Sequence, residues 1–176
     1  NGAGKSTSLH MFTTIVKPTS GTAKVAGFDV TSQAAAVRAS IGVVFQEPAL
    51  DERLTARENL EIHAVLYGLN HKQTKEAIAH ALEWSDLSSV AQRPLRIFSG
   101  GMKRRLELAR SLMHTPKLLF LDEPTLGLDP QGRIHLWERV QGLREAGLTV
   151  FMTTHYLQEA ESCDRVGIMD KGQLIA

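Results

Sequence analysis

The chain opens with the stretch Asn1-Gly2-Ala3-Gly4-Lys5-Ser6-Thr7. Glycines in such a loop let backbone N–H groups wrap around an anion, and a helix starting at about Lys5 would point its positive end at the same place. In a phosphate-binding loop of this kind, Lys5 would reach the β- and γ-phosphates of a nucleotide and the Ser6 hydroxyl would bind Mg²⁺. The complete pattern has one more glycine upstream of Asn1. Glycine-rich turns before helices also serve purely structural ends, so this motif alone leaves both interpretations open.

A second motif combines an apolar strand with two acids. Leu118 to Leu121 are apolar, and Asp122 and Glu123 follow directly. An isolated buried carboxylate is costly, and a divalent cation nearby would remove that cost. Asp122 would then hold Mg²⁺, directly or through water, and Glu123 would orient and polarise the attacking water. Two solvated acids in a loop after the strand explain the same residues equally well.

The alternation of short apolar segments and amphipathic helices predicts an α/β fold with a mainly parallel sheet. The predicted strands are Val25 to Gly27, Ile41 to Phe45, Leu118 to Asp122, Thr149 to Thr153 and Arg165 to Met169, the last before a tight turn at Asp170-Lys171-Gly172. The predicted helices begin at about Lys5, Thr55, Thr74, Ser99 and Arg133. The first of them places Leu9, Phe12 and Val16 on one face and ends before Pro18.

The composition changes from about Thr55 to Val90, where the pattern is helical throughout. Thr55-x-x-Glu58 is a capping box, in which each side chain satisfies a backbone N–H group at the start of a helix. We therefore expect one domain over residues 1–176, in which a helical subdomain at 47–97 is inserted between core segments 1–46 and 98–176.

Six motifs follow one another in the order found in the ABC ATPase family, which the sequence resembles over essentially its whole length. Asn1 to Thr7 resembles the Walker A loop, Gln46 the Q-loop glutamine, Ser99-Gly100-Gly101 the signature, Asp122-Glu123 the Walker B acids, Leu126-Gly127-Leu128-Asp129 the D-loop, and His155 the switch histidine. The resemblance implies a P-loop NTPase fold and ATP hydrolysis, with ATP and Mg²⁺ as cofactors.

The resemblance also implies the role of each motif residue. By this resemblance the catalytic residues are Glu123, His155 and Gln46, and the Mg²⁺ ligands are Ser6, Gln46 and Asp122. Nucleotide is bound by Asn1, Gly2, Ala3, Gly4, Lys5, Ser6 and Thr7, together with Ser99, Gly100, Gly101 and Asp129. In the family, the signature acts on nucleotide held by the opposite subunit, and the N-terminus of its helix is a suitable receptor for a γ-phosphate.

Two departures from the family pattern are informative. Met102 stands where many members carry Gln, which resembles the branch of exporter ATPases associated with drug, antibiotic or ion efflux. The adjacent basic run, Lys103-Arg104-Arg105, is expected to be a solvated helix face or a subunit contact. The family's first strand and its adenine-stacking aromatic residue are expected upstream of Asn1, outside this sequence.

Composition narrows the classes of partner. The net charge of +1 and the isoelectric point near 8.1 are too mild to favour nucleic acid. The sequence has no run of about 18 apolar residues, so we expect no direct membrane insertion. A single cysteine, Cys163, excludes an internal disulfide and fits a reducing cytoplasm.

The sequence therefore predicts the ATPase subunit of an ABC exporter, which forms a homodimer or a paired cassette around MgATP. Its expected partner is an integral-membrane translocating subunit, reached from the cytoplasmic side of the membrane and docked around Gln46, Ala49, Leu50 and Leu54. One alternative is a soluble ABC-class ATPase acting on ribosomes or DNA, although no second P-loop and no sustained heptads are present. Another is a regulatory cassette that binds nucleotide without hydrolysing it, which the intact Glu123 and His155 count against.

Overall fold

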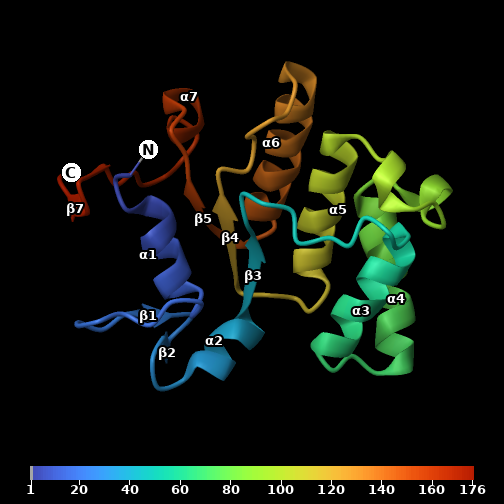
Figure 1. The fold of residues 1–176 in the computed structure, drawn as a ribbon, viewed down its shortest axis with the longest axis horizontal. Coiled ribbons are helices and arrows are strands. Elements are labelled where there is room, and N and C mark those ends of the chain that lie inside the picture. The colour runs from blue at the N-terminus through green and yellow to red at the C-terminus, as the bar shows by residue number, and fades with distance from the viewer. Residues whose placement is uncertain (1) are drawn as a thin grey trace.

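A three-stranded parallel sheet forms the centre of the structure, a computed structural model that describes residues 2–176 (Figure 1). Its strands are β3 (Ile41–Val44), β4 (Leu118–Asp122) and β5 (Thr149–Thr153), in the order β3-β4-β5. The register pairs Val44 with Leu121 and Asp122 with Thr153, so the carboxyl ends of all three strands meet at one edge. The predicted α/β fold with a mainly parallel sheet is confirmed.

Side chains of the central strand alternate between the two faces of the sheet, as the period of two in a strand requires. Phe120 packs on one face with Leu9 of α1 (Lys5–Phe12) and Val37 of α2 (Ala34–Ser40). Leu119 and Leu121 pack on the other face, against α5 (Gly100–Leu112) and α6 (Pro130–Glu145). Helices therefore cover both faces of the sheet, as its two-sided burial demands.

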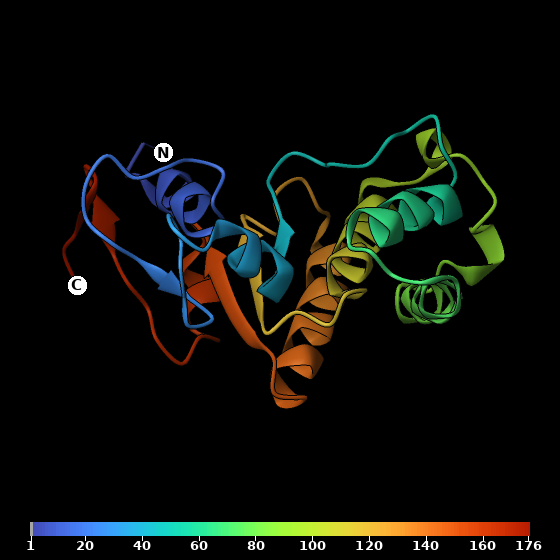
Figure 2. The same ribbon diagram turned by 90° about the horizontal axis from the view of Figure 1, so that it is seen from below.

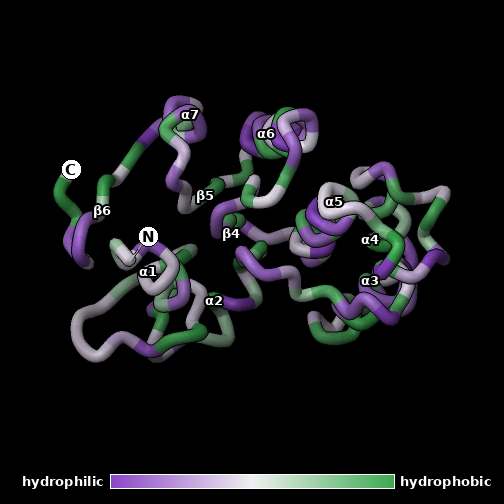
Figure 3. Tube along the Cα trace, turned by 45° about the horizontal axis from the view of Figure 1, so that its top comes forward, coloured by the Kyte–Doolittle hydropathy of each residue, from purple (hydrophilic) through white to green (hydrophobic). Residues whose placement is uncertain are grey.

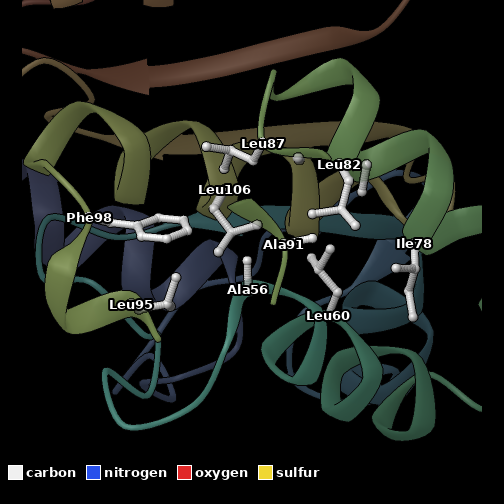
Figure 4. Packing of buried hydrophobic residues seen from close by; sticks show 11 residues of the cluster. Ala56, Leu60, Ile78, Leu82, Leu87, Ala91, Leu95, Phe98 and Leu106 are labelled. Atoms are coloured by element: carbon white, nitrogen blue, oxygen red, sulfur yellow. The ribbon is translucent and has the colours of Figure 1, made fainter. Parts of the chain in front are cut away.

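The segment between β3 and α5 is helical, with α3 (Ala56–Leu66), α4 (His71–Trp84) and the 3₁₀ turns η1 (Ser88–Val90) and η2 (Leu95–Ile97). Its buried side chains form one cluster that also includes Leu106 and Ala109 of α5 (Figure 4). Figure 2 shows α3 and α4 on the side of α5 away from the sheet. Because α5 contributes to this cluster and to the core of the sheet, it connects the two regions, and the boundaries at 47 and 97 stay a prediction.

Helix starts follow local capping chemistry. The predicted capping box is confirmed, since the Glu58 amide donates to Thr55 Oγ1 at 3.2 Å and the Thr55 amide donates to Glu58 Oε2 at 2.7 Å. A second box, formed by Asn70 and Gln73, starts α4 at His71, three residues before the predicted start at Thr74.

Several predicted boundaries are wrong. α1 ends at Phe12 because Thr14 adopts a left-handed φ of 66°, and Val16 lies beyond the helix with an exposed fraction of 42%. α6 begins at Pro130 rather than Arg133, with Asp129 as its N-cap.

The predicted strand over 25–27 is instead a hairpin of β1 (Lys24–Val25) and β2 (Phe28–Asp29). Of the predicted strand over 165–169, only Met169 is extended, in β6 (Met169–Asp170). β6 pairs with β7 (Gln173–Leu174) across the predicted tight turn, whose Lys171 and Gly172 both have positive φ. The helices α2 and α7 (Leu157–Ala160) were not predicted.

Hydrophilic and hydrophobic residues alternate along the helices of the molecule (Figure 3), as expected of helices that each bury one face. Within residues 2–176, none of the helices has the length and apolar character needed to cross a membrane.

Candidate functional site

The glycine-rich loop leads directly into α1. Gly2 and Gly4 have φ values of 87° and 97°, which residues with a Cβ atom rarely adopt, and Gly4 is the N-cap of the helix. Lys5 and Ser6 form the first turn, where backbone N–H groups lack partners within the helix. The loop thus offers the anion-binding geometry that the sequence predicted. Asn1, which is also predicted to contact nucleotide, lies outside the described residues.

Asp122 lies beside this loop at the end of β4, with an exposed fraction of only 3%. Its Oδ1 atom accepts hydrogen bonds from the Ser6 hydroxyl, at 3.2 Å, and from the Thr153 hydroxyl. Among residues 2–176 the Asp122 carboxylate forms no ion pair with lysine, arginine or histidine. A buried carboxylate next to a serine hydroxyl, without an ion-pair partner among the described residues, is a donor set that suits Mg²⁺. Ser6 and Asp122, two of the three predicted metal ligands, are therefore brought together.

The third predicted ligand, Gln46, is exposed just after β3, the strand next to β4. Within the described part of the chain, no hydrogen bond joins its side chain to Ser6 or Asp122. Its position fits the rule that ligands of open α/β sheets bind at the carboxyl ends of strands.

Glu123 and His155 are in direct contact. His155 Nδ1 lies 3.3 Å from Glu123 Oε2, and the exposed fractions of the two side chains are 38% and 13%. The Glu123 backbone has a left-handed φ of 45°, and its amide donates to the Thr153 carbonyl oxygen at 3.1 Å. The strained backbone turns Glu123 out of the strand direction, next to His155 in the segment that follows β5. Glu123 and His155, two of the three residues predicted as catalytic, therefore meet at the edge of the sheet.

The predicted signature lies apart from this cluster. Ser99 is the N-cap of α5, and its Oγ atom accepts a hydrogen bond from the Met102 amide at 3.2 Å. Ser99 and Gly100 are exposed, and a Cβ atom on Gly100 would meet nothing within 4 Å. α1 packs on one face of the sheet and α5 on the other (Figure 1), so this chain does not place its own signature on its own phosphate loop.

Asp129, the remaining predicted nucleotide contact, is exposed at the N-cap of α6 and makes no capping hydrogen bond with its side chain. A Cβ atom on Gly132 would lie 2.8 Å from Asp129 Oδ1, so the glycine leaves space for the carboxylate.

Sequence reasoning misplaced Arg104, the middle residue of the basic run. It was expected on a solvated face or at a subunit contact, but its exposed fraction is 7% and its guanidinium lies against the carboxyl ends of β3 and β4. Glu107, one helical turn later, is 2% exposed and pairs with it at 3.3 Å. The opposite charges at positions i and i+3, flanked by the apolar Leu106 and Leu108, were the available signal.

Sequence reasoning also missed Thr125, Thr153 and Glu159. Thr153 donates to Asp122, and Glu159 accepts hydrogen bonds from Thr125 and Thr154. The spacing of these three residues matches no motif, so their hydrogen bonds could not be predicted without the fold.

A cavity of about 410 Å³ opens elsewhere, between α4, α5 and the end of α6. Its lining is largely apolar, with Trp84, Leu112, Met113 and Leu143 among the residues. None of the predicted site residues in the described part of the chain lines it, so the cavity is separate from the phosphate loop.

The parallel sheet, the glycine-rich loop and the acidic pair at the end of β4 define a P-loop nucleotide-binding domain. Comparison with known families agrees: residues 1–126 match the family described as "ABC transporter", and the chain belongs to this family.

Over its entire length the chain is 46% identical to the linearmycin resistance ATP-binding protein of Bacillus subtilis and 46% identical to the daunorubicin/doxorubicin resistance ATP-binding protein of Streptomyces peucetius. It is 43% identical to the Nod factor export ATP-binding protein I of Burkholderia orbicola. The chain spans between 54% and 58% of these three relatives, or somewhat over half of their length.

Solved structures show the same fold. The structure of cbiO1 from Clostridium perfringens, described as part of the ABC transporter complex cbiONQ, aligns over 100% of this chain and 72% of its own, with a TM-score of 0.88 and 31% identity. An ATP-binding cassette solved as a dimer after hydrolysis, with ADP and Pi bound, aligns over 99% of this chain and 79% of its own, with a TM-score of 0.87 and 26% identity.

Proposed function

We propose that this chain forms the ATP-binding and ATP-hydrolysing part of an ABC exporter. The observation that carries the proposal is the contact between Glu123 and His155, next to the hydrogen bond between the buried Asp122 and the half-buried Ser6. A nucleotide-binding loop, a metal-binding carboxylate and a candidate general base are thereby gathered at one edge of the sheet. The names of the relatives, which include resistance and export proteins, support the assignment to export.

The residues would divide the work as follows. The loop from Gly2 to Thr7 and the first turn of α1 bind the phosphates, and Lys5 neutralises their charge. Mg²⁺, when bound by Ser6 and Asp122, supplies positive charge to the transferred phosphoryl group. Glu123 accepts the proton of the attacking water, and the contact with His155 Nδ1 fixes the orientation of its carboxylate.

Replacing Glu123 with Gln in the full-length protein tests this assignment. The amide keeps the shape of the side chain but cannot accept a proton, so turnover should fall by about 100-fold or more while MgATP binding is retained. Glu161→Gln provides the control, since Glu161 is exposed and outside the site. Near-wild-type turnover of Glu123→Gln would remove Glu123 from the role of general base.

We also infer that two copies of the cassette face each other around two ATP molecules. In support, Ser99 and Gly100 present an exposed helix N-terminus that lies on the opposite side of the sheet from α1, and a related cassette forms a dimer. Lys5→Ala and Ser99→Ala chains, each inactive alone, should recover part of the ATPase activity when mixed, because one site of the mixed dimer carries neither change. Absence of recovery at every mixing ratio would contradict action in trans.

The proposed partner is an integral-membrane translocating subunit that docks from the cytoplasmic side near Gln46. Gln46 and Ala49 are exposed and Leu54 is half-buried, which leaves them accessible, whereas Leu50 packs against the helical cluster. Leu54→Glu should therefore release the protein from membranes and abolish export without loss of ATP binding. Val65→Glu, at a residue of α3 with an exposed fraction of 73%, is the control for added charge. Membrane association of Leu54→Glu equal to that of the control would place the docking surface elsewhere.

A further inference from the structure

The side chain of Arg104 connects α5 to two strands at once. Its guanidinium donates to four backbone carbonyl oxygens, those of Phe45 at 2.6 Å, Pro124 at 2.9 Å, Asp122 at 3.3 Å and Glu123 at 3.5 Å. Three of the four are consecutive residues at the end of β4, and the fourth directly precedes Gln46. The Arg104 guanidinium thus holds the backbone of Asp122 and Glu123 in a fixed position relative to the backbone that precedes Gln46.

Glu107 completes the connection. Its Oε2 atom lies 3.3 Å from Arg104 Nη1, and its Oε1 atom accepts the Ala49 amide proton at 2.7 Å. The segment containing Gln46 is therefore held on both sides, through the carbonyl group of Phe45 and the amide of Ala49. Burial lowers the pKa of the Arg104 guanidinium, and the charges of Glu107 and Asp122 oppose that shift.

The backbone at Glu123 needs such support. With a φ of 45°, this residue lies in the left-handed region that side chains disfavour, and a conformation of this kind persists only where its surroundings enforce it. Backbone carbonyl groups at a buried strand end also require partners. Arg104 supplies partners to the carbonyl groups on either side of Glu123 and to that of Glu123 itself.

We propose that Arg104 and Glu107 form a positioning pair that holds Glu123 in its productive orientation and links it to the Gln46 segment. This proposal rests on the proposed ATPase function. Because Arg104 lies five residues after Ser99 in the same helix, about 7.5 Å along its axis, a force on the exposed end of α5 reaches both strand ends through a rigid element. The other explanation of a buried ion pair is that it serves only folding.

The test is to replace the pair by apolar residues of similar volume. Such a replacement of a buried ion pair often leaves stability unchanged or raises it, whereas removal of one partner leaves an uncompensated charge. In the full-length protein, Arg104→Met/Glu107→Leu leaves no charge unpaired, but four carbonyl groups and the Ala49 amide lose their partners, so the variant should fold with reduced thermal stability and still bind MgATP. Its kcat should fall by about 100-fold, because small misplacement of catalytic groups is that costly. Arg105→Met is the matched control, since Arg105 donates to a carbonyl oxygen of the helical region, that of Ser85.

Thermal unfolding, nucleotide titration and steady-state turnover separate the outcomes. A folded double variant with wild-type kcat would overturn the proposal and leave the ion pair a structural feature. Should the double variant fail to fold, Arg104→Lys decides by the same measurements, because it keeps the charge next to Glu107 but cannot reach four carbonyl groups. Unchanged kcat in that variant would also overturn the proposal. An inactive wild-type protein would instead refute the proposed function itself, and Glu123→Gln provides the reference for lost chemistry.

Discussion

Glu159 offers a quantitative test of how the segment that contains His155 is held in place. Its exposed fraction is 6%, and its two carboxylate oxygens accept hydrogen bonds from the hydroxyls of Thr125 and Thr154. Thr125 lies two residues after Glu123, and Thr154 directly precedes His155. Glu159 thus joins the loop that follows β4 to the loop that follows β5, and it does so without contacting Glu123 or His155 by any hydrogen bond within residues 2–176.

The expected loss of stability follows from these two bonds. A hydrogen bond to a charged group contributes about 1.5–3 kcal/mol, so Glu159→Ala should reduce the free energy of unfolding by about 3–6 kcal/mol if neither threonine finds a new partner. Glu159→Gln keeps the volume, and its amide group can still bond to both hydroxyls, which accept as well as donate. We expect that variant to lose only about half as much, since the charge alone is removed.

Urea unfolding of the full-length protein without nucleotide measures both values, with Glu161→Ala as the control at an exposed position two residues later. Turnover should follow the same order, with Glu159→Gln more active than Glu159→Ala, because the position of His155 depends on Thr154. If the free energy of unfolding of Glu159→Ala lies within about 1 kcal/mol of the wild-type value, the two hydrogen bonds contribute no more to stability than an exposed ion pair does.

Two further predictions concern packing and pH. A Cβ atom on Gly42 would lie 2.5 Å from the Ser111 carbonyl oxygen, so Gly42→Ala should lower the free energy of unfolding in urea by about 1–3 kcal/mol. Gly142→Ala is the control, since a Cβ atom there would meet nothing within 4 Å. Equal stabilities of the two variants would show that β3 can shift away from α5 without cost. Burial, followed by the charges of Arg110 and His114, lowers the pKa of His63 from 6.5 to about 3. Because the unfolded chain then binds the proton more readily, stability that is complete above the unfolded pKa should decline as the pH falls from about 6.5 towards 3. His63→Leu should flatten that decline, and an unchanged slope would contradict it.

The place of Gln46, Asp122, Glu123 and His155 in the fold could be predicted because they lie at or just after the ends of strands, whereas their roles stay a prediction. Apolar runs locate β3, β4 and β5, and the carboxyl ends of parallel strands must share an edge. The convergence of Asp122, Glu123 and His155 therefore follows from the order of elements, and Gln46 makes no hydrogen bond to these three residues within the described part of the chain. The capping box at Thr55 was readable for a similar reason, since both partners lie within one helical turn.

The elements that were missed depend on tertiary contacts or on short local signals. α2 is a helix of seven residues that buries only Val37, too short for a clear helical period. The left-handed φ values at Thr14 and Ala26, which end α1 and turn the β1–β2 hairpin, occur at residues without a strong preference for that region. The Asn70–Gln73 box is a local signal of four residues that places the start of α4 before the predicted Thr74.

Arg104 shows why the polar framework around the site could not be inferred from composition. A run of three basic residues is typical of a solvated face, and the sequence does not say which of them faces the strand ends. In the fold, Lys103 pairs with Glu52 at 2.5 Å and Arg105 bonds to Ser85, so the three cations point to three different regions. Only the crossing of α5 over the ends of β3 and β4 selects the middle one for burial.

Glu107 and Glu159, the buried acids other than Asp122 among the described residues, have a similar structural role. Glu107 acts with Arg104 to join the ends of β3 and β4, and Glu159 joins the segments after β4 and β5. Glu107 acts through Arg104 on the backbone of Glu123, and Glu159 acts through Thr154 on the segment that contains His155. Neither carboxylate forms a hydrogen bond to Glu123 or His155 within the described residues. The free-energy effects of mutations add when the sites are distant and independent, but not when the sites belong to one network. If both Glu159 and the Arg104–Glu107 pair orient Glu123 against His155, the losses in kcat caused by Glu159→Gln and by Arg104→Met/Glu107→Leu should therefore combine less than additively, when each is expressed as a free energy. Simple additivity of the two losses would mean that each acid supports its own strand end, with no shared task.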